Sequence, residues 1–269
     1  TLYYHGPVIF NDIGMENPDL IRDYFSLGFT RPRYLFGNPR LSWNVSLYYS
    51  ADHLAPDSDA GDILYHGPDA GFALGYRLPS LYYPAVPKHH IRLSAGLFHS
   101  MAGDYDFSVY KTSLTLGSQL LSERFGLQSR LTYIHADGDL PALQALGIDR
   151  FYEYDVPRDL SYTRSIRGID RDIFGETLYW SSTELRYFLS EKTPFTLLIL
   201  PVTNLVLTGF VDAARVGGVA DLAVYSWGGE ISFGNELTRF AAGIARGYVQ
   251  EHDQGEKYYL RLSVYLSEM

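Results

Sequence analysis

KYYLRLSVYL, residues 257–266, is the stretch that decides the fold. Every second residue in it is large and apolar: Tyr258, Leu260, Leu262, Val264 and Leu266. The positions between them include Lys257, Arg261 and Ser263, which suit a polar environment. Successive side chains of a β-strand point to opposite faces, whereas an amphipathic helix repeats every 3.6 residues. The stretch therefore predicts a strand with one apolar face and one polar face.

The same alternation recurs along the chain, separated by segments that contain Gly, Pro, Asn or Asp. It is clear at 41–49, 70–78, 91–97, 110–120, 125–133 and 225–234, and further candidates are 2–10, 24–35, 177–189, 196–212 and 239–249. Together with 257–266 these segments predict about twelve strands. One short helical pattern, Leu140–Arg150, lies inside a long connection. Many short alternating strands with almost no helix indicate an all-β sandwich or barrel.

Composition excludes several classes of protein. The 269 residues (30.4 kDa) carry 31 Asp and Glu against 22 Lys and Arg, a formal charge of −9. An acidic balance argues against nucleic acid as a partner, because nucleic-acid binding requires a basic surface. The absence of cysteine excludes disulfides, cysteine-ligated metals and a cysteine nucleophile. We expect no cofactor and no metal site.

The polar faces separate a membrane barrel from a soluble sandwich. They are filled largely by small residues, as at Gly243, Ala245 and Gly247, which suits the interior of a barrel. The opposite faces carry Leu, Tyr, Trp and Phe, as lipid-facing walls and their interfacial belts do. We therefore predict a single domain over 1–269, an antiparallel transmembrane β-barrel in contact with outer-membrane lipid. A soluble β-sandwich is the alternative.

Connection lengths support the same interpretation. Outer-membrane barrels have long outer loops and short periplasmic turns. The connections at 52–69, 138–176 and 213–224 are long, and those at 122–124, 190–195 and 235–238 are short, with 79–90 as an exception on the short side. The longest, taken as 137–176, is expected to be an outer loop.

Three charged residues in the second half of the chain form a pattern. Arg167, followed by Gly168, lies in the longest loop, Glu184 lies on the next strand, and Asp212 lies on the strand after that. Strand parity places both carboxylates on the face opposite the apolar wall. Carboxylates in a partly desolvated interior need a partner, and a guanidinium can fork two of them. We predict that the loop folds into the lumen and that Arg167 meets Glu184 and Asp212.

These segments resemble the BamA, TamA and FhaC superfamily of outer-membrane assembly and two-partner-secretion barrels, the bacterial surface antigen family. IRGI at 166–169 is similar to its Val-Arg-Gly-Phe/Tyr loop motif, and TELR at 183–186 to its strand motif. FVDAA at 210–214 is similar to its Phe-x-Asp-x-Gly motif. Five predicted strands follow the loop, as in the family. The resemblance covers about residues 160–269, and the first half matches only by alternation.

Several features depart from the family pattern. Ile169 stands where the family has an aromatic residue, and Ala214 where it has the last glycine, whereas Phe210 matches. The family barrel usually has sixteen strands, and this sequence predicts about twelve. POTRA domains, the periplasmic modules that receive client proteins, are absent from residues 1–269. The chain also ends without an aromatic residue.

The resemblance implies a protein of the bacterial outer membrane that assists insertion of proteins into that membrane or export across it. Partners would be unfolded clients and periplasmic or lipoprotein subunits. The Arg167, Gly168, Glu184 and Asp212 set would lock the loop, with Ile169, Phe210 and Ala214 as supporting positions, and would perform no catalysis. A non-catalytic anchor or scaffold barrel for a partner protein and a passive pore are the alternatives. A lumen salt bridge of purely structural value also fits the three charges.

Other residue patterns in the sequence give weaker indications of a functional site. Glu184 and Asp212 on neighbouring strands match the carboxylate spacing of a glycosidase, but no further feature indicates an enzyme. His89 and His90 are adjacent on a strand and should face opposite ways, so a shared metal is not expected. The acidic segment 52–62 allows a calcium site, although solvated loops are commonly acidic.

Overall fold

The computed structural model is almost entirely β-strand, as alternating sequence predicts. It describes residues 2–10, 20–38, 40–56, 63–78, 88–103, 106–120, 124–139, 146–148, 163–164, 166–169, 173–189, 195–197, 200–218, 221–234 and 238–264. A short 3₁₀ turn, Leu35–Gly37, is the one helical element of the described part. None of the helical structure described there is long and apolar enough to cross a membrane.

One large antiparallel sheet follows the order of the chain. Its strands are β1 (Leu2–Phe10), β2 (Leu20–Tyr34), β3 (Leu41–Pro56), β4 (Ile63–Leu78), β5 (His89–His99), β7 (Phe107–Leu120), β8 (Phe125–Gly138), β12 (Thr177–Phe188), β14 (Leu200–Gly217), β15 (Leu222–Gly234), β16 (Thr238–Val249) and β17 (His252–Val264). Two short strands lie off this path: β6 (Ala102–Gly103) pairs with β4, and β13 (Phe195–Leu197) with β14. The predictions of an all-β antiparallel architecture and of about twelve principal strands are confirmed.

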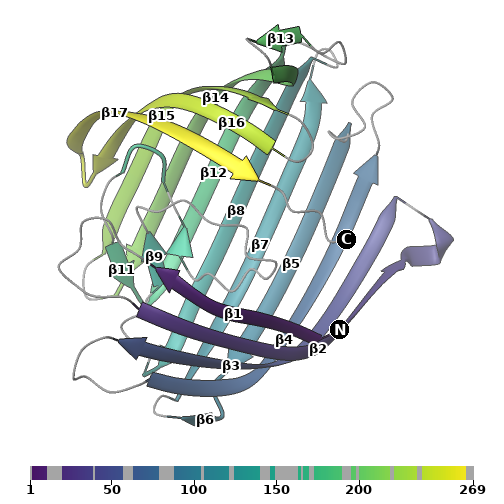
Figure 1. Ribbon diagram of the computed structural model, residues 1–269, viewed down its shortest axis with the longest axis vertical. Helices are drawn as coiled ribbons and strands as arrows, with labels where there is room; N and C mark the ends of the chain where they lie inside the picture. The colour runs from purple at the N-terminus through teal and green to yellow at the C-terminus, as the bar shows by residue number, and fades with distance from the viewer. Residues whose placement is uncertain are drawn as a thin grey trace.

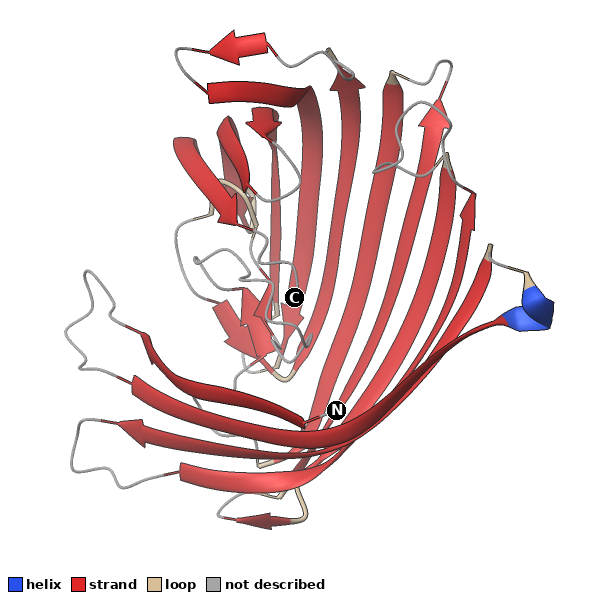
Figure 2. Ribbon diagram, turned by 45° about the vertical axis from the view of Figure 1, so that its right-hand side comes forward, coloured by secondary structure: helices blue, strands red, loops and turns tan. Residues whose placement is uncertain are grey.

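The sheet curls around its own concave face, which gives a barrel-like wall (Figures 1 and 2). A three-stranded sheet made of β9 (Leu146–Ile148), β10 (Thr163–Arg164) and β11 (Ile173–Gly175) lies within the curve (Figure 1). No pairing joins β1 to β17 among the described residues. Tyr258 and Leu260 on β17 are 78% and 87% exposed, against 38–56% for the apolar residues on the convex faces of β12, β14, β15 and β16. The wall is therefore open beside β17.

Strand parity holds as the sequence predicted. On β14 the odd-numbered Val211 is 56% exposed on the convex side, whereas its neighbours Phe210 and Asp212 are buried on the concave side. On β12 Leu185 is exposed while Ser182 is buried. The apolar stripe therefore forms the outer wall, and the charged residues of the loop-lock pattern face inward.

The interior is more apolar than the small-residue pattern suggested. A cluster of buried side chains fills the end of the lumen nearest the long loop: Phe98, Phe107, Val109, Ile134, Ala136, Leu178, Ala214, Val216, Val224 and Val249 from the wall, with Ile166, Ile169 and Ile173 from the loop. Burying such side chains is worth about 1.5–3 kcal/mol each. The wall residues of this cluster face inward by strand parity and are buried because the infolded loop covers them.

Three local expectations were wrong. The helical pattern at 140–150 contains a strand, β9, because residues 146–148 pair with β10 and β11. The connections expected at 52–69 and 213–224 are shorter, since β3 runs to Pro56, β4 starts at Ile63, and Gly218–Asp221 alone joins β14 to β15. Backbone pairing continues there after the apolar alternation has ended. The rest of the acidic segment, 57–62, lies outside the described residues.

Candidate functional site: the Arg167 loop lock

A four-residue turn presents Arg167 to the inner wall. The N–H of Ile169 donates to the carbonyl of Ile166 at 3.1 Å, which closes the turn. Gly168, its third residue, has φ +84°, the left-handed value that a type II turn demands of that position and that glycine adopts without strain. Ile166 and Ile169 are buried on either side. The two isoleucines anchor the turn and leave the guanidinium as its inward-reaching group.

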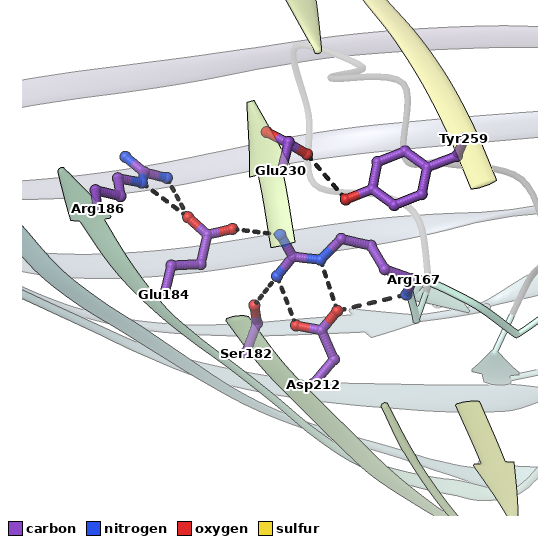
Figure 3. A network of polar contacts seen from close by, with 7 residues as sticks. All are labelled: Arg167, Ser182, Glu184, Arg186, Asp212, Glu230 and Tyr259. Atoms are coloured by element: carbon purple, nitrogen blue, oxygen red, sulfur yellow. Dashed lines mark hydrogen bonds and ion pairs between the residues drawn. The ribbon is translucent and has the colours of Figure 1, made fainter. Parts of the chain in front are cut away.

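Asp212 on β14 is the main partner of Arg167. The guanidinium donates from Nε to Oδ2 and from Nη2 to Oδ1, both at 2.7 Å, in a two-pronged pair (Figure 3). The backbone N–H of Arg167 also points to Oδ2, at 3.4 Å. Asp212 is 2% exposed and Arg167 is 7% exposed. Two parallel charge-assisted bonds between buried groups fix both position and orientation.

Glu184 on β12 engages the remaining edge of the guanidinium. Nη1 of Arg167 donates to Oε1 of Glu184 at 2.9 Å. The other oxygen of Glu184 accepts from Nε of Arg186 at 2.9 Å and from its Nη2. Glu184 is thus shared between two arginines (Figure 3). The structure brings together the three charged residues that the sequence pattern singled out.

Two uncharged side chains complete the contacts of Arg167. Nη2 donates a further bond to Oγ of Ser182 at 3.1 Å. The guanidinium carbon lies 3.6 Å from the ring centroid of Phe210, within the range of a cation–π contact. Phe210 was expected as a supporting position. Ser182 was missed, although its place two residues before Glu184 on the same strand face was visible in the sequence.

Small residues of β16 form the seat for the turn. A Cβ built on Gly168 would lie 2.8 Å from Cβ of Ala245. A Cβ on Gly247 would lie 2.5 Å from Cδ1 of Ile169 and 2.7 Å from the carbonyl oxygen of Gly168. The turn therefore sits directly on the strand, and any larger side chain at these positions would displace it. Ala245 and Gly247 belong to the small residues that the sequence pattern assigned to the barrel interior.

The two departures from the family motif lie in apolar surroundings. Ile169 and Ala214 are both buried in the apolar cluster that also includes Val216 and Val249. An aliphatic side chain at 169 packs against the glycine seat, and a methyl group at 214 faces the loop side of the wall. Their apolar character suits these places without any hydrogen-bonding role.

A second polar contact ties the last strand to the same wall. The hydroxyl of Tyr259 on β17 donates to Oε2 of Glu230 on β15 at 3.2 Å (Figure 3). Its ring crosses the intervening strand at Gly243, where an added Cβ would lie 2.4 Å from the ring. Sequence reasoning missed this pair, because only strand register reveals that the residues face each other across β16.

The arrangement is suited to holding a loop against the wall. Glu184 and Asp212, the two carboxylates whose spacing matches a glycosidase, are both paired with guanidinium groups. Such pairing keeps a carboxylate ionised, whereas a glycosidase needs one of the two to donate a proton. No cluster of three or more potential metal ligands occurs in the described part of the chain. Removing one member of such a buried set leaves an uncompensated charge, at a cost of about 3–5 kcal/mol. Separating the turn from the wall would therefore be strongly disfavoured unless water replaced these contacts.

Comparison with known proteins agrees with the fold. No family model matches the sequence, and no curated protein matches it. Among solved structures, the chain resembles BamA from Haemophilus ducreyi lacking POTRA domains 1–3, with a TM-score of 0.56 and 14% sequence identity. The match covers 92% of this chain and 55% of that one, so this chain spans about half the length of its structural neighbour. The likeness shows a BamA-like barrel fold.

Proposed function

We propose that this chain is a bacterial outer-membrane β-barrel domain that assists the insertion of proteins into that membrane or their export across it. The observation that carries the proposal is the loop lock, in which an infolded turn is held by Arg167 against Asp212 and Glu184. It occurs on a wall with a BamA-like fold. The same ordered residues support the resemblance to the BamA and FhaC superfamily.

The open side of the wall supports this role physically. β17 pairs with β16 on one side, and its outward residues Tyr258 and Leu260 are largely exposed. An uncovered strand edge offers backbone donors and acceptors to an incoming strand, so a client could pair there by β-augmentation. The convex apolar face would meet outer-membrane lipid, and the loop would occupy the lumen. In this role the residues of the lock position the loop and carry out no chemistry.

The test compares the unmodified protein with Arg167→Ala in proteoliposomes that receive an unfolded client barrel. We expect the variant to fold, judged by heat-modifiable migration on a gel, and to lose most of its stimulation of client insertion. Arg215→Ala is the matched control, because Arg215 pairs with Asp221 at an exposed position outside the lock. Full activity of a folded Arg167→Ala variant would overturn the proposal.

An anchor or scaffold barrel for a partner protein is the second candidate. The loop isoleucines pack into a continuous apolar cluster with the wall, and a rigid plug of this kind suits a static support. The same plug opposes a passive pore. If the protein is a scaffold, the unmodified protein would not stimulate client insertion. Every defect of Arg167→Ala would then be explained by a smaller amount of folded barrel.

A further inference from the structure

Three rows of inward-facing residues cross the middle of the wall, and their charges are unevenly divided. One row runs through Arg92, Thr115, Arg130, Ser182 and Asp212 on β5, β7, β8, β12 and β14. The next runs through Arg77, His90, Gly117, Gln128 and Glu184 on β4, β5, β7, β8 and β12. The third runs through Gln119, Gly126, Arg186, Thr208 and Glu230 on β7, β8, β12, β14 and β15. The acids therefore lie on β12, β14 and β15, and the arginines other than Arg186 lie on β4, β5 and β8.

The acids of these rows are already occupied. Asp212 is held by Arg167, and Glu184 is shared by Arg167 and Arg186. Arg92 and Arg130 form no ion pair with any described residue, and both are exposed on the lumen side. Arginines that face the interior of a barrel are the groups that line pores selective for anions.

Two arginines lie beside one imidazole in the strand register. Arg77 is paired with His90 across β4 and β5, and Arg92 follows His90 by two residues on the same face of β5. The charges of Arg130 and Arg186 also act on His90. The ring of His90 covers Gly117, where a Cβ would lie 1.9 Å from Cε1. Its Nδ1 is buried and makes no hydrogen bond within the described structure. The centre of the basic wall thus holds a polar atom that is shielded but unsatisfied.

The size of this basic wall indicates the kind of ligand. Neighbouring strands lie about 4.8 Å apart, so Arg92 and Arg130, separated by β7, are roughly 10 Å apart at the backbone. The full set from Arg77 on β4 to Arg186 on β12 spans about 19 Å by the same spacing. A single phosphate is too small to reach across it. An extended peptide places side chains of one face about 7 Å apart, so several carboxylates could meet the arginines together.

We propose that the inner wall formed by Arg77, Arg92, Arg130 and Arg186 around His90 is a binding surface for an acidic, extended polypeptide segment. The guanidinium groups of Arg92 and Arg130 would receive carboxylates in forked, charge-assisted pairs, and Arg77 and Arg186 would add positive charge to the surface. The surface is separate from the loop seat on β16, and binding there does not depend on the proposed role in insertion or export.

The test uses the full chain in detergent micelles and a fluorescein-labelled hexaglutamate peptide, read by fluorescence anisotropy across a salt series. We expect binding that weakens as salt rises, and at least a tenfold loss of affinity in Arg92→Gln/Arg130→Gln. Arg215→Gln, at an exposed site outside this wall, should bind as the unmodified chain does. The single Arg92→Gln variant, which breaks no ion pair, should show an intermediate loss in a protein that still migrates as a folded barrel.

Two results would overturn the proposal. Unchanged hexaglutamate affinity in the folded double variant would show that the peptide binds elsewhere or not at all. Displacement of the peptide by inorganic phosphate at an equal concentration of negative charge would show a site for small anions instead of an extended segment. Arg92→Lys/Arg130→Lys separates charge from geometry, and we expect it to bind more weakly than the unmodified chain because lysine cannot form forked pairs.

Discussion

Arg167 and Asp212, 45 residues apart in the sequence, form a two-pronged ion pair with both bonds at 2.7 Å inside the barrel-like wall. Both side chains are almost completely buried. The pair joins an otherwise separate loop to the centre of a principal strand. Its energetic importance lies in what remains when one partner is removed, because a buried charge without its partner is strongly destabilising.

Replacing Arg167 with alanine should free the loop from the wall. We expect a loss of about 3–5 kcal/mol of stability from the uncompensated Asp212, measured as a lower midpoint of unfolding in urea. Tryptic cleavage within the connection 139–176 should become faster. Arg167→Lys should recover only part of the stability, since an ammonium group cannot fork Asp212 while also reaching Glu184. Full recovery by lysine would contradict the forked geometry.

The two acids should differ in importance. Asp212→Asn removes the charge from a side chain 2% exposed that receives both prongs of the pair, so it should approach the effect of Arg167→Ala. Glu184→Gln should cost less, about 1–3 kcal/mol, because Glu184 accepts a single bond from Arg167. The temperature at which half of each variant shifts from folded to unfolded migration on a gel ranks the stability of the two variants. The reverse order would mean that Glu184 is the principal anchor.

Gly168→Ala should displace the turn for two reasons. The residue has φ +84°, and its new methyl carbon would lie 2.8 Å from Cβ of Ala245. The backbone strain alone is worth about 1–3 kcal/mol. Gly209→Ala is the control, since a Cβ there meets nothing within 4 Å. We expect faster loop proteolysis in Gly168→Ala and none beyond the unmodified rate in Gly209→Ala. Equal behaviour of the two variants would exclude close seating of the turn.

Tyr259 should hold β17 against the wall. Tyr259→Phe removes the hydroxyl that donates to Glu230, which is buried. We expect a modest destabilisation of about 1 kcal/mol and faster hydrogen exchange confined to β17 and its neighbour β16. Gly243→Ala should disturb the same strands more strongly because the ring of Tyr259 occupies the space of the new methyl group. Exchange rates unchanged in both variants would show that the contact does not secure the strand.

An exposed ion pair provides the contrast to the lock. Arg215 donates to Asp221 beside the connection between β14 and β15, and this hydrogen bond lowers the pKa of the Asp221 carboxyl. Solvent and salt screen such a pair, so Arg215→Ala should leave stability unchanged within error. The midpoint of urea unfolding at neutral pH measures this stability. A loss equal to that of Arg167→Ala would mean that burial does not set the strength of these pairs.

The period of two was sufficient to predict the architecture, because apolar and polar residues alternate in a strand that has one face against lipid or core and the other in a polar environment. It also gave the inward direction of Glu184 and Asp212, since parity follows from the apolar neighbours Leu185 and Val211. The lengths of the strands were not predictable in the same way. Beyond the apolar band the outward face of β14 carries Arg215, whereas Ala214 and Val216 face inward, so backbone pairing continues after the outward apolar pattern has ended.

Contacts that depend on the register between strands could not be predicted from the sequence either. Tyr259 and Glu230 meet only because β15, β16 and β17 align in one register, which places Gly243 between them. Likewise, Ala245 and Gly247 look alike as small residues, and only the position of the turn shows that they form its seat. The apolar plug was missed because Ile166, Ile169 and Ile173 lie in a connection that has no regular period.

The most direct test of the loop lock is a cross-link between the turn and its seat. The chain has no cysteine, so Ile169→Cys/Gly247→Cys introduces the single possible pair. The shorter side chain at 169 removes Cδ1, the atom that would lie 2.5 Å from a Cβ on residue 247, and so makes room for the second cysteine. In membranes we expect rapid cross-linking of this pair and none in Ile169→Cys/Gly209→Cys, whose second thiol faces outward. Ready labelling of Cys introduced at 169 by a bulky external maleimide, without cross-linking to position 247, would contradict an infolded loop.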